Sequence, residues 1–363
     1  MIAYFTKQYQ AVPALMPLYE ALGGEFVTTR PSTRRALRRV YPDVPVTLLR
    51  ESLGRLSRGD ALLRRADAIV TGSPNRALLS RYRAKKYMVF HGTYALLSPA
   101  DIEAMRHFDH ICVIGPRMAE LLVASDLQEK LIPSGYLPFL AFPERTPELK
   151  RNFLTRTGLD PAAKTLLYLP MGKPHGSWDV MAEKLLRQVP RRYNLILRPH
   201  PSQSVTARLK DRLGFLRLQR LCRERGNALL DLTSCKLSTL FAIGDLVIAD
   251  GASAAEEALY YDLPLLFVEG TWFSPGRRAD LSQRFPAEYI EKLFSLSECG
   301  MKMPREEKNV SHLIESSLAE ADRYRPRRQA YFAWVFGDRD RVRQGKLIDH
   351  LRRFSSPQQK RCS

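Results

Sequence analysis

The sequence LVIADGAS, Leu246–Ser253, passes from four apolar residues into a polar turn, and an alanine-rich segment follows it over 254–261. A short apolar run without alternation is typical of a strand that is buried on both faces of a sheet. The alanine-rich segment predicts a helix, and Pro264–Val268 predicts the next strand. A strand, a helix and a second strand in this order indicate a parallel β-α-β unit.

The same alternation extends along most of the chain, and a proline-rich segment over 133–150 divides it into two halves. We therefore expect an α/β fold with two Rossmann-like parallel-sheet domains that face a central cleft. The expected domains are 1–145, 146–325 and a C-terminal helical segment, 326–363, that packs back on the first. The expected strands are Ile2–Phe5, Glu25–Thr28, Ala68–Val70, Tyr87–Phe90, His110–Ile114, Thr165–Leu169, Asn194–Leu197, Ala228–Asp231, Leu246–Ala249 and Pro264–Val268.

The composition is that of a globular protein: of 363 residues, 45% are hydrophobic and 26% are charged. This excludes a largely disordered chain. The five cysteines are widely spaced without a C-x-x-C pair, which is unlike a disulfide framework or a zinc site and favours a reducing compartment. No apolar run approaches the roughly 20 residues of a membrane span. We expect a cytoplasmic protein, either soluble or peripheral on the inner face of the cell membrane.

Positive charge is concentrated in one part of the chain. The formal net charge is +19, and residues 30–86 alone hold fifteen Lys and Arg against four Asp and Glu. An excess of this size favours an anionic partner. Two interpretations remain open for this basic region, a solvated surface or a docking surface for a polyanionic acceptor or an anionic membrane.

Phe90-His91-Gly92-Thr93 directly follows one expected strand. A histidine at the carboxyl end of a strand lies at the edge where open α/β sheets bind ligands. Its imidazole titrates near neutral pH and can accept a proton from a hydroxyl group. Gly92 permits close approach of a substrate, and Thr93 can donate a hydrogen bond. The alternative interpretation is a packed histidine in a structural turn.

Arg198-Pro199-His200-Pro201 directly follows another expected strand. Its two prolines restrict the backbone and so hold the intervening side chains in place. A guanidinium group suits a bidentate phosphate contact, and the imidazole adds a second donor. The segment therefore predicts a phosphate site, with a proline-rich turn as the alternative.

Asp250-Gly251-Ala252-Ser253 joins a strand to a helix. Backbone N–H groups, a hydroxyl group and the positive end of a helix meet there, which favours phosphate. Because a carboxylate beside a phosphate is unfavourable, we expect Asp250 to orient backbone N–H groups or His200. The alternative for Ser253 is a helix cap, in a capping box with Glu256 or Glu257.

These motifs make the chain similar to a known family. It resembles the CDP-glycerol glycerophosphotransferases of the teichoic-acid polymerase type and, more broadly, enzymes of the GT-B glycosyltransferase fold. Over about residues 65–350 the similar segments occur in the family's order: Phe90–Thr93 resembles its H-G-T motif, Leu197–Pro201 its R-x-H-P motif and Ile248–Ser253 its S-D-Y-S-S motif. The chain departs from the family where Gly251-Ala252-Ser253 replaces Tyr-Ser-Ser and where no lysine follows H-G-T.

The resemblance implies a transferase that moves glycerol phosphate, or a related polyol phosphate, from a CDP-linked donor to a hydroxyl group and releases CMP. The acceptor would be a cell-surface polysaccharide or an anionic or lipid-linked glycan. His91 would be the base for the acceptor hydroxyl, and His200 with Arg198 would stabilise charge on the pyrophosphate. The remaining residues implied in donor or phosphate binding are Gly92, Thr93, Asp250, Gly251, Ser253 and Glu256.

The scheme requires no metal ion and no cofactor. Asp338-Arg339-Asp340 has the D-x-D spacing of metal-dependent transferases. It lies between arginines and follows no expected strand, so we expect a salt-bridged loop there.

Two other functions remain open. An H-P motif on a similar fold also occurs in bacterial sialyltransferases, so the donor can be a nucleotide sugar such as CMP-sialic acid, a Kdo-type donor or a UDP-sugar. The high charge invites a nucleic-acid-binding protein. We do not expect a nucleic-acid partner, because no nucleic-acid module is recognisable and Tyr41 and Tyr82 are the only aromatic residues that interrupt the basic stretch before Lys85.

Overall fold

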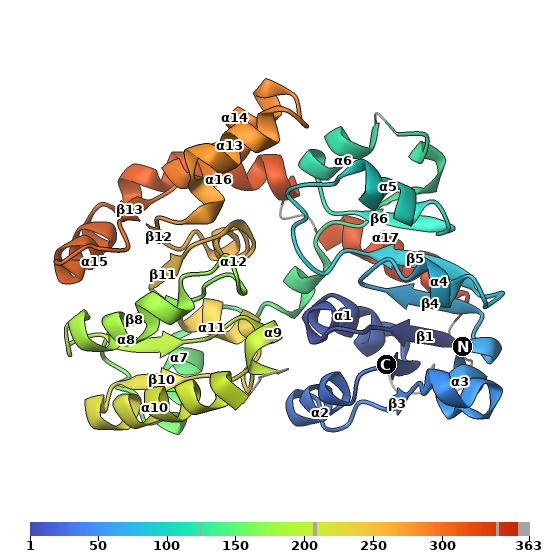
Figure 1. The fold of residues 1–363 in the computed structure, drawn as a ribbon, viewed down its shortest axis with the longest axis horizontal. Helices are drawn as coiled ribbons and strands as arrows, with labels where there is room; N and C mark the ends of the chain where they lie inside the picture. The colour runs from blue at the N-terminus through green and yellow to red at the C-terminus, as the bar shows by residue number, and fades with distance from the viewer. Residues whose placement is uncertain (124, 206–208, 339–340, 355–363) are drawn as a thin grey trace. The chain divides into compact units, whose positions relative to one another are not determined.

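The computed structural model describes residues 1–123, 125–205, 209–338 and 341–354. The chain divides into two compact units, the first comprising Met1–Ala141 with Ala333–Ser363 and the second Phe142–Phe332. Each unit is built on a parallel β-sheet with helices packed around it (Figure 1). The predicted α/β class with two Rossmann-like parallel-sheet domains is confirmed.

The sheet of the first unit has seven strands in the order β3-β2-β1-β4-β5-β6-β7, and every pair is parallel. The direction of winding reverses between β1 and β4. In open sheets of this kind, ligands bind beyond the carboxyl ends of the strands, at the point of reversal. All four residues of β1 and of β4 are buried, because helices cover both faces of the sheet. The strands are β1 Ile2–Phe5, β2 Glu25–Thr28, β3 Val46–Leu48, β4 Ala68–Thr71, β5 Lys85–Val89, β6 His110–Val113 and β7 Leu131–Pro133.

The sheet of the second unit repeats this winding with six strands in the order β10-β9-β8-β11-β12-β13. Its direction of winding reverses between β8 and β11, and we call this position the switch point. The inner strands β9, β8, β11 and β12 are buried along their whole length. The strands are β8 Thr165–Tyr168, β9 Asn194–Leu197, β10 Ala228–Leu230, β11 Leu246–Ala249, β12 Leu265–Val268 and β13 Met301–Met303.

Helices connect the strands of each sheet, and α16, Ala321–Phe336, runs from the second unit into the first. The helices of the first unit are α1 Val12–Leu22, α2 Pro31–Val40, α3 Arg58–Arg65, α4 Arg76–Leu79, α5 Pro99–Met105, α6 Pro116–Val123 and α17 Arg341–Arg352. Those of the second are α7 Pro147–Arg156, α8 Trp178–Gln188, α9 Pro201–Ser204, α10 Leu209–Arg225, α11 Leu237–Ile243, α12 Ala252–Ala258, α13 Pro275–Ser282, α14 Ala287–Phe294 and α15 Val310–Ala319. Of the helices described, none is both long and apolar enough to cross a membrane.

Three strands have no counterpart in the sequence prediction: β3, β7 and β13. Each has three residues and forms an edge of its sheet. Edge strands are covered less completely, so Pro133 in β7 and Lys302 in β13 are exposed. These three strands are short and only partly buried, and they lack the longer apolar run by which the central strands are recognised.

The C-terminal helix α17 packs on the first unit. Leu347 and Leu351, one turn apart, are fully buried. His350 on the same helix lies against β5, where the Tyr87 hydroxyl is 3.0 Å from its Nε2. The helix thus contributes apolar and polar contacts to the first unit.

Candidate active site

In the second unit, three loops gather at the carboxyl edge of the sheet. They follow β9, β8 and β11, which are neighbours in the sheet, and two of them carry Arg198 and His200, and Asp250 and Gly251. The third loop, 169–177 after β8, is absent from the sequence prediction of the site. Parallel order explains the gathering, because all three strands end at one edge next to the switch point.

Asp250 ties two of these loops together. Its carboxylate is buried, and Oδ1 accepts a hydrogen bond of 2.6 Å from the Met171 backbone N–H. Oδ2 accepts from the Ser177 backbone N–H and, at 2.5 Å, from the Ser177 hydroxyl. The expectation that Asp250 orients backbone N–H groups is confirmed, and its negative charge is turned to the 171–177 loop.

Arg198 forms a buried ion pair that holds the loop after β9. Its Nη1 lies 2.6 Å from Asp231 Oδ2 and donates to the Cys235 carbonyl at 2.8 Å, and both charged side chains are almost fully buried. Asp231 Oδ1 also accepts from Ser234, through its backbone N–H at 2.8 Å and its hydroxyl at 2.6 Å. Asp231 has a signal in the sequence, because it lies where the strand expected at Ala228–Asp231 ends.

His200 is the N-cap of the short helix α9. Its Nδ1 accepts a hydrogen bond of 3.2 Å from the Ser202 backbone N–H, and the Ser202 hydroxyl lies 2.7 Å from the same atom. A nitrogen that accepts from an N–H group carries no proton, so the neutral ring is protonated on Nε2. This tautomer presents a hydrogen-bond donor, which is what a phosphate oxygen requires.

At Gly172 and Gly251 the backbone lies in direct contact with side chains of a neighbouring loop. A Cβ atom at Gly172 would lie 2.9 Å from His200 Nδ1 and 3.1 Å from Ser202 Oγ. At Gly251 it would lie 2.1 Å from Met171 Cγ. The three loops therefore pack closely against one another, and this packing leaves no room for a side chain at positions 172 and 251.

Replacing Gly172 with alanine is expected to lower the free energy of unfolding by about 1–3 kcal/mol, because the added methyl group must displace the His200 ring. Urea denaturation measures this. The matched control is Gly214→Ala in the exposed middle of α10, where an added methyl group would have no atom within 4 Å. That change is expected to stabilise the protein by roughly 0.5–1 kcal/mol. Equal effects at the two positions would contradict the close packing at Gly172.

The start of α12 bears on the two interpretations of Ser253, a phosphate contact or a helix cap. Its N-cap is Gly251, without a side-chain cap, so the capping-box interpretation of Ser253 is wrong. Ser253 is exposed on the first turn. Glu256 is fully buried and accepts a 2.9 Å hydrogen bond from the Tyr331 hydroxyl of α16. Of this pair, Ser253 is therefore the residue that a ligand can reach.

His91 lies at the corresponding edge of the first unit, just beyond β5. Its Nδ1 is hydrogen-bonded to the Gly72 carbonyl, which follows the neighbouring strand β4. A carbonyl only accepts, so Nδ1 carries the proton and Nε2 is left with a lone pair. Burial lowers the pKa of His91 below its ordinary value of 6.5, with the Gly72 hydrogen bond acting in the opposite direction. The ring is thus set to accept a proton at Nε2.

The residues after His91 support this arrangement. The Tyr94 hydroxyl is 3.0 Å from His91 Nδ1, and Tyr94 adopts a left-handed backbone with φ of 44°. Gly92 is partly buried. Thr93 is buried, and its carbonyl accepts a 2.8 Å hydrogen bond from the buried Arg117. The Thr93 hydroxyl is also buried and has no partner among the described residues, which leaves a hydrogen-bonding group unused.

The structure therefore forms two groups from the predicted site residues. Arg198, His200, Asp250, Gly251 and Ser253 lie along one edge of the second unit, whereas His91, Gly92 and Thr93 lie in the first. In the D-x-D segment, Arg339 and Asp340 lie outside the described residues. Positioning residues that the sequence prediction missed are Gly72, Tyr94, Arg117, Met171, Gly172, Ser177 and Asp231.

No protein-family model matches the chain, and no curated protein matches it. Solved structures do match. The wall teichoic acid polymerase TagF, soaked with CDPG, is similar with a TM-score of 0.67 and 15% identity, over 97% of this chain and 88% of that one.

Two further matches contain UDP. Anabaena HepE in complex with UDP and glucose has a TM-score of 0.55 and 12% identity, over 96% of this chain and 98% of that one. S. aureus MnaA with UDP has a TM-score of 0.58 and 14% identity, over 97% and 96%. At such identities the likeness shows the fold. It confirms the predicted GT-B fold and the resemblance to the teichoic-acid polymerase type at that level.

Proposed function

We propose that this chain is a transferase that moves glycerol phosphate, or a related polyol phosphate, from a CDP-linked donor to the hydroxyl group of a glycan acceptor, with release of CMP. The observation that carries the proposal is the assembly of three loops at the switch point of the second unit. There Asp250 holds the 171–177 loop, and the Gly172 backbone packs against His200. Such preorganised donors stabilise charge that develops on a phosphate group.

In this proposal His200 donates through Nε2–H to the pyrophosphate. Arg198 adds a positive charge nearby while its ion pair with Asp231 keeps the loop rigid. Gly251 and Ser253 offer a backbone N–H group and an exposed hydroxyl group at the start of α12. Asp250 and Glu256 act as positioning residues, because each carboxylate is buried against protein donors.

His91 is the proposed base. Its Nε2 takes the proton from the acceptor hydroxyl, whose oxygen forms a bond to the β-phosphorus of the donor while the bond between that phosphorus and the CMP oxygen breaks. Gly72 and Tyr94 hold the ring in the tautomer this step requires. Gly92 and Thr93 follow His91 directly, and the Thr93 hydroxyl, which has no partner among the described residues, is proposed to bind a donor or acceptor oxygen.

The acceptor in this proposal is an anionic or lipid-linked glycan of the cell envelope, met at the cytoplasmic face of the membrane. The basic region 30–86 supplies positive charge for such a partner. A second candidate is a glycosyltransferase that uses a nucleotide sugar, since two solved structures of the same fold contain UDP.

A thermal-unfolding panel with CDP-glycerol, CDP-ribitol, CMP-sialic acid, UDP-sugars, CMP and a short DNA duplex tests the proposal. We expect stabilisation by the CDP-polyols and CMP. A ligand present at 100 times its Kd adds about 2.7 kcal/mol to the free energy of unfolding. The shift is expected to disappear in His200→Ala and to persist in His312→Ala, a histidine exposed on α15 of the same unit.

Each alternative result has a clear meaning. Stabilisation by UDP-sugars alone would replace the CDP-linked donor with a nucleotide sugar. A shift with DNA that falls steeply with salt, without any nucleotide effect, would overturn the transferase proposal in favour of nucleic-acid binding. Equal loss of the CMP shift in His200→Ala and His312→Ala would remove His200 from the site.

A further inference from the structure

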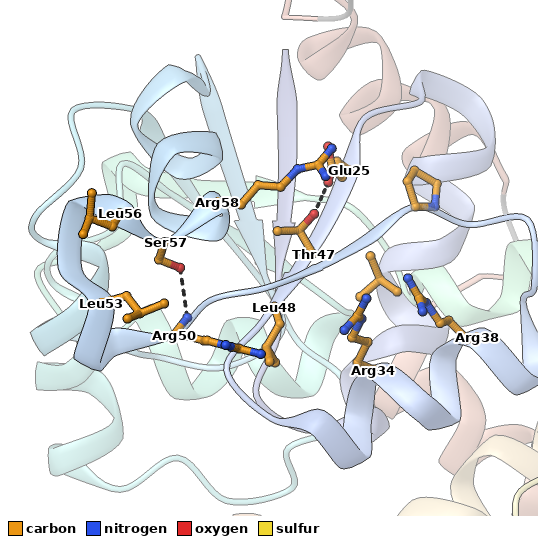
Figure 2. A pocket seen from close by; sticks show the side chains of 12 residues that line it. Glu25, Arg34, Arg38, Thr47, Leu48, Arg50, Leu53, Leu56, Ser57 and Arg58 are labelled. Carbon is orange, nitrogen blue, oxygen red and sulfur yellow. Dashed lines mark hydrogen bonds between the residues drawn. The ribbon is translucent and has the colours of Figure 1, made fainter.

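A pocket of about 460 Å³ lies on the first unit along the edge strand β3, and His91 is not part of its lining. Arginines from three segments line it: Arg34 and Arg38 from α2, Arg50 after β3, and Arg58 at the start of α3. Figure 2 shows Arg34 and Arg38 on one side and Leu53 and Leu56 on the turn at the other. We call this feature the arginine pocket.

The lining of the arginine pocket carries more positive than negative charge. Glu25 is the one acidic residue in its lining, and the Thr47 hydroxyl donates to its carboxylate. None of the four arginines forms a salt bridge with a described acidic residue. The Arg34 Nε is buried and has no hydrogen-bond partner among the described residues. A buried donor without a partner is costly, and an anion in the pocket would satisfy it.

The rim of the same pocket is apolar and exposed. Leu56 is 87% exposed and Leu53 45%, and they lie on the 3-10 turn Glu51–Leu56, which has no buried residue. Exposing two leucines on one short turn gains nothing in the free protein. Arg55, between them in sequence, is exposed as well, and so is Glu51 at the start of the turn.

We propose that the arginine pocket binds the phosphate group of an anionic phospholipid headgroup, with Leu53 and Leu56 inserted among the acyl chains beneath. Guanidinium groups bind phosphate oxygens in a bidentate manner, and apolar residues beside basic ones are typical of segments that lie on a membrane surface. A soluble polyanion would use the arginines but leave the leucines in water. The inference rests on the membrane location given in the proposed function, which it deepens, and it does not depend on the transfer chemistry.

Flotation of the full-length chain with vesicles tests this directly. We expect binding to vesicles of phosphatidylcholine mixed with phosphatidylglycerol and little binding to phosphatidylcholine alone. Arg34→Gln combined with Arg38→Gln is expected to weaken binding by about 30-fold, at roughly fivefold for each charge. Leu56→Ser is expected to weaken binding as well, and this loss should persist at high salt, since it is not electrostatic.

The matched control is Arg81→Gln combined with Arg83→Gln, which removes the same charge from exposed positions of the same basic region, outside the pocket. It is expected to weaken binding by less than about threefold. Equal losses in the two double variants would overturn the pocket in favour of a diffuse charge effect. Absence of binding to phosphatidylglycerol vesicles, or an unchanged affinity in Leu56→Ser, would overturn the membrane assignment.

A soluble arm separates the two sources of phosphate. Inorganic phosphate and glycerol 1-phosphate, added to the vesicle assay at matched ionic strength, are expected not to displace the protein, because neither engages the leucines. Displacement by either at millimolar concentration would assign the pocket to a free phosphate compound instead.

Discussion

Replacing His91 with alanine or asparagine is expected to lower turnover by about 10²–10⁴-fold with little change in the free energy of unfolding. Alanine removes the ring. Asparagine keeps an N–H group near the position of Nδ1, so it can still donate to the Gly72 carbonyl, yet it has no basic nitrogen. If both variants lose turnover, the loss is due to the missing basic nitrogen and not to the missing hydrogen bond to Gly72. CMP release from CDP-glycerol, measured with an acceptor glycan, provides the rate.

The pH dependence gives a second test of His91. A base acts in its neutral form, so kcat/KM falls as the pH drops through its pKa. Because burial lowers that pKa from 6.5, the acid limb is expected below pH 6.5, with a plateau above it. His312→Ala is the control for removal of an exposed imidazole. Turnover that survives in His91→Asn, or an acid limb that is the same in that variant, would contradict the role of His91 as the base.

Replacing Asp231 with alanine is expected to lower the free energy of unfolding by about 3–5 kcal/mol, because it leaves the Arg198 guanidinium buried without its counter-charge. The change also removes the acceptor for Ser234. Urea denaturation measures the effect. Arg220→Ala is the control, since it breaks an exposed Arg220–Glu224 pair at a similar distance, 2.8 Å, and such pairs contribute about 0–1 kcal/mol.

A double variant, Arg198→Met with Asp231→Leu, separates stability from binding. Apolar residues of similar size remove the unpaired charge, so part of the stability lost in Asp231→Ala is expected to return. Stabilisation by CMP is expected to be lost, because the guanidinium group that we propose lies beside the nucleotide phosphate is gone. A cost in Asp231→Ala no greater than in Arg220→Ala would contradict the structural role of the pair, and a CMP shift retained in the double variant would remove Arg198 from the donor site.

Much of the architecture follows from local pattern. Strands such as Ile2–Phe5, Asn194–Leu197 and Leu246–Ala249 are predicted with the bounds that the structure shows, because burial on both faces demands an unbroken apolar run. The edge strands β3, β7 and β13 escape the same reasoning, since partial exposure relaxes that demand. The polar segments after β5, β9 and β11 are likewise visible in the sequence, because catalytic and binding residues gather at the carboxyl ends of parallel strands.

The contacts of those polar residues depend on partners far along the chain. Asp250 binds Met171, 79 residues away, Arg198 binds Asp231, 33 residues away, and His91 binds Gly72, 19 residues away. From the neighbouring residues alone, Ser253 is as compatible with a helix N-cap as with a phosphate contact. Only the structure shows that the N-cap of α12 is Gly251.

Local sequence was therefore sufficient for the fold class and for locating the polar segments after β5, β9 and β11, whereas the tertiary structure decided which groups each side chain contacts within them. The physical reason is that burial acts on each segment separately and leaves a pattern in it. A hydrogen bond or ion pair requires two groups at a defined distance, and that distance is set by the order β9-β8-β11 and β4-β5 in the assembled sheets. The opposite tautomers of His91 and His200 arise in this way, from the carbonyl of Gly72 in one case and the N–H group of Ser202 in the other.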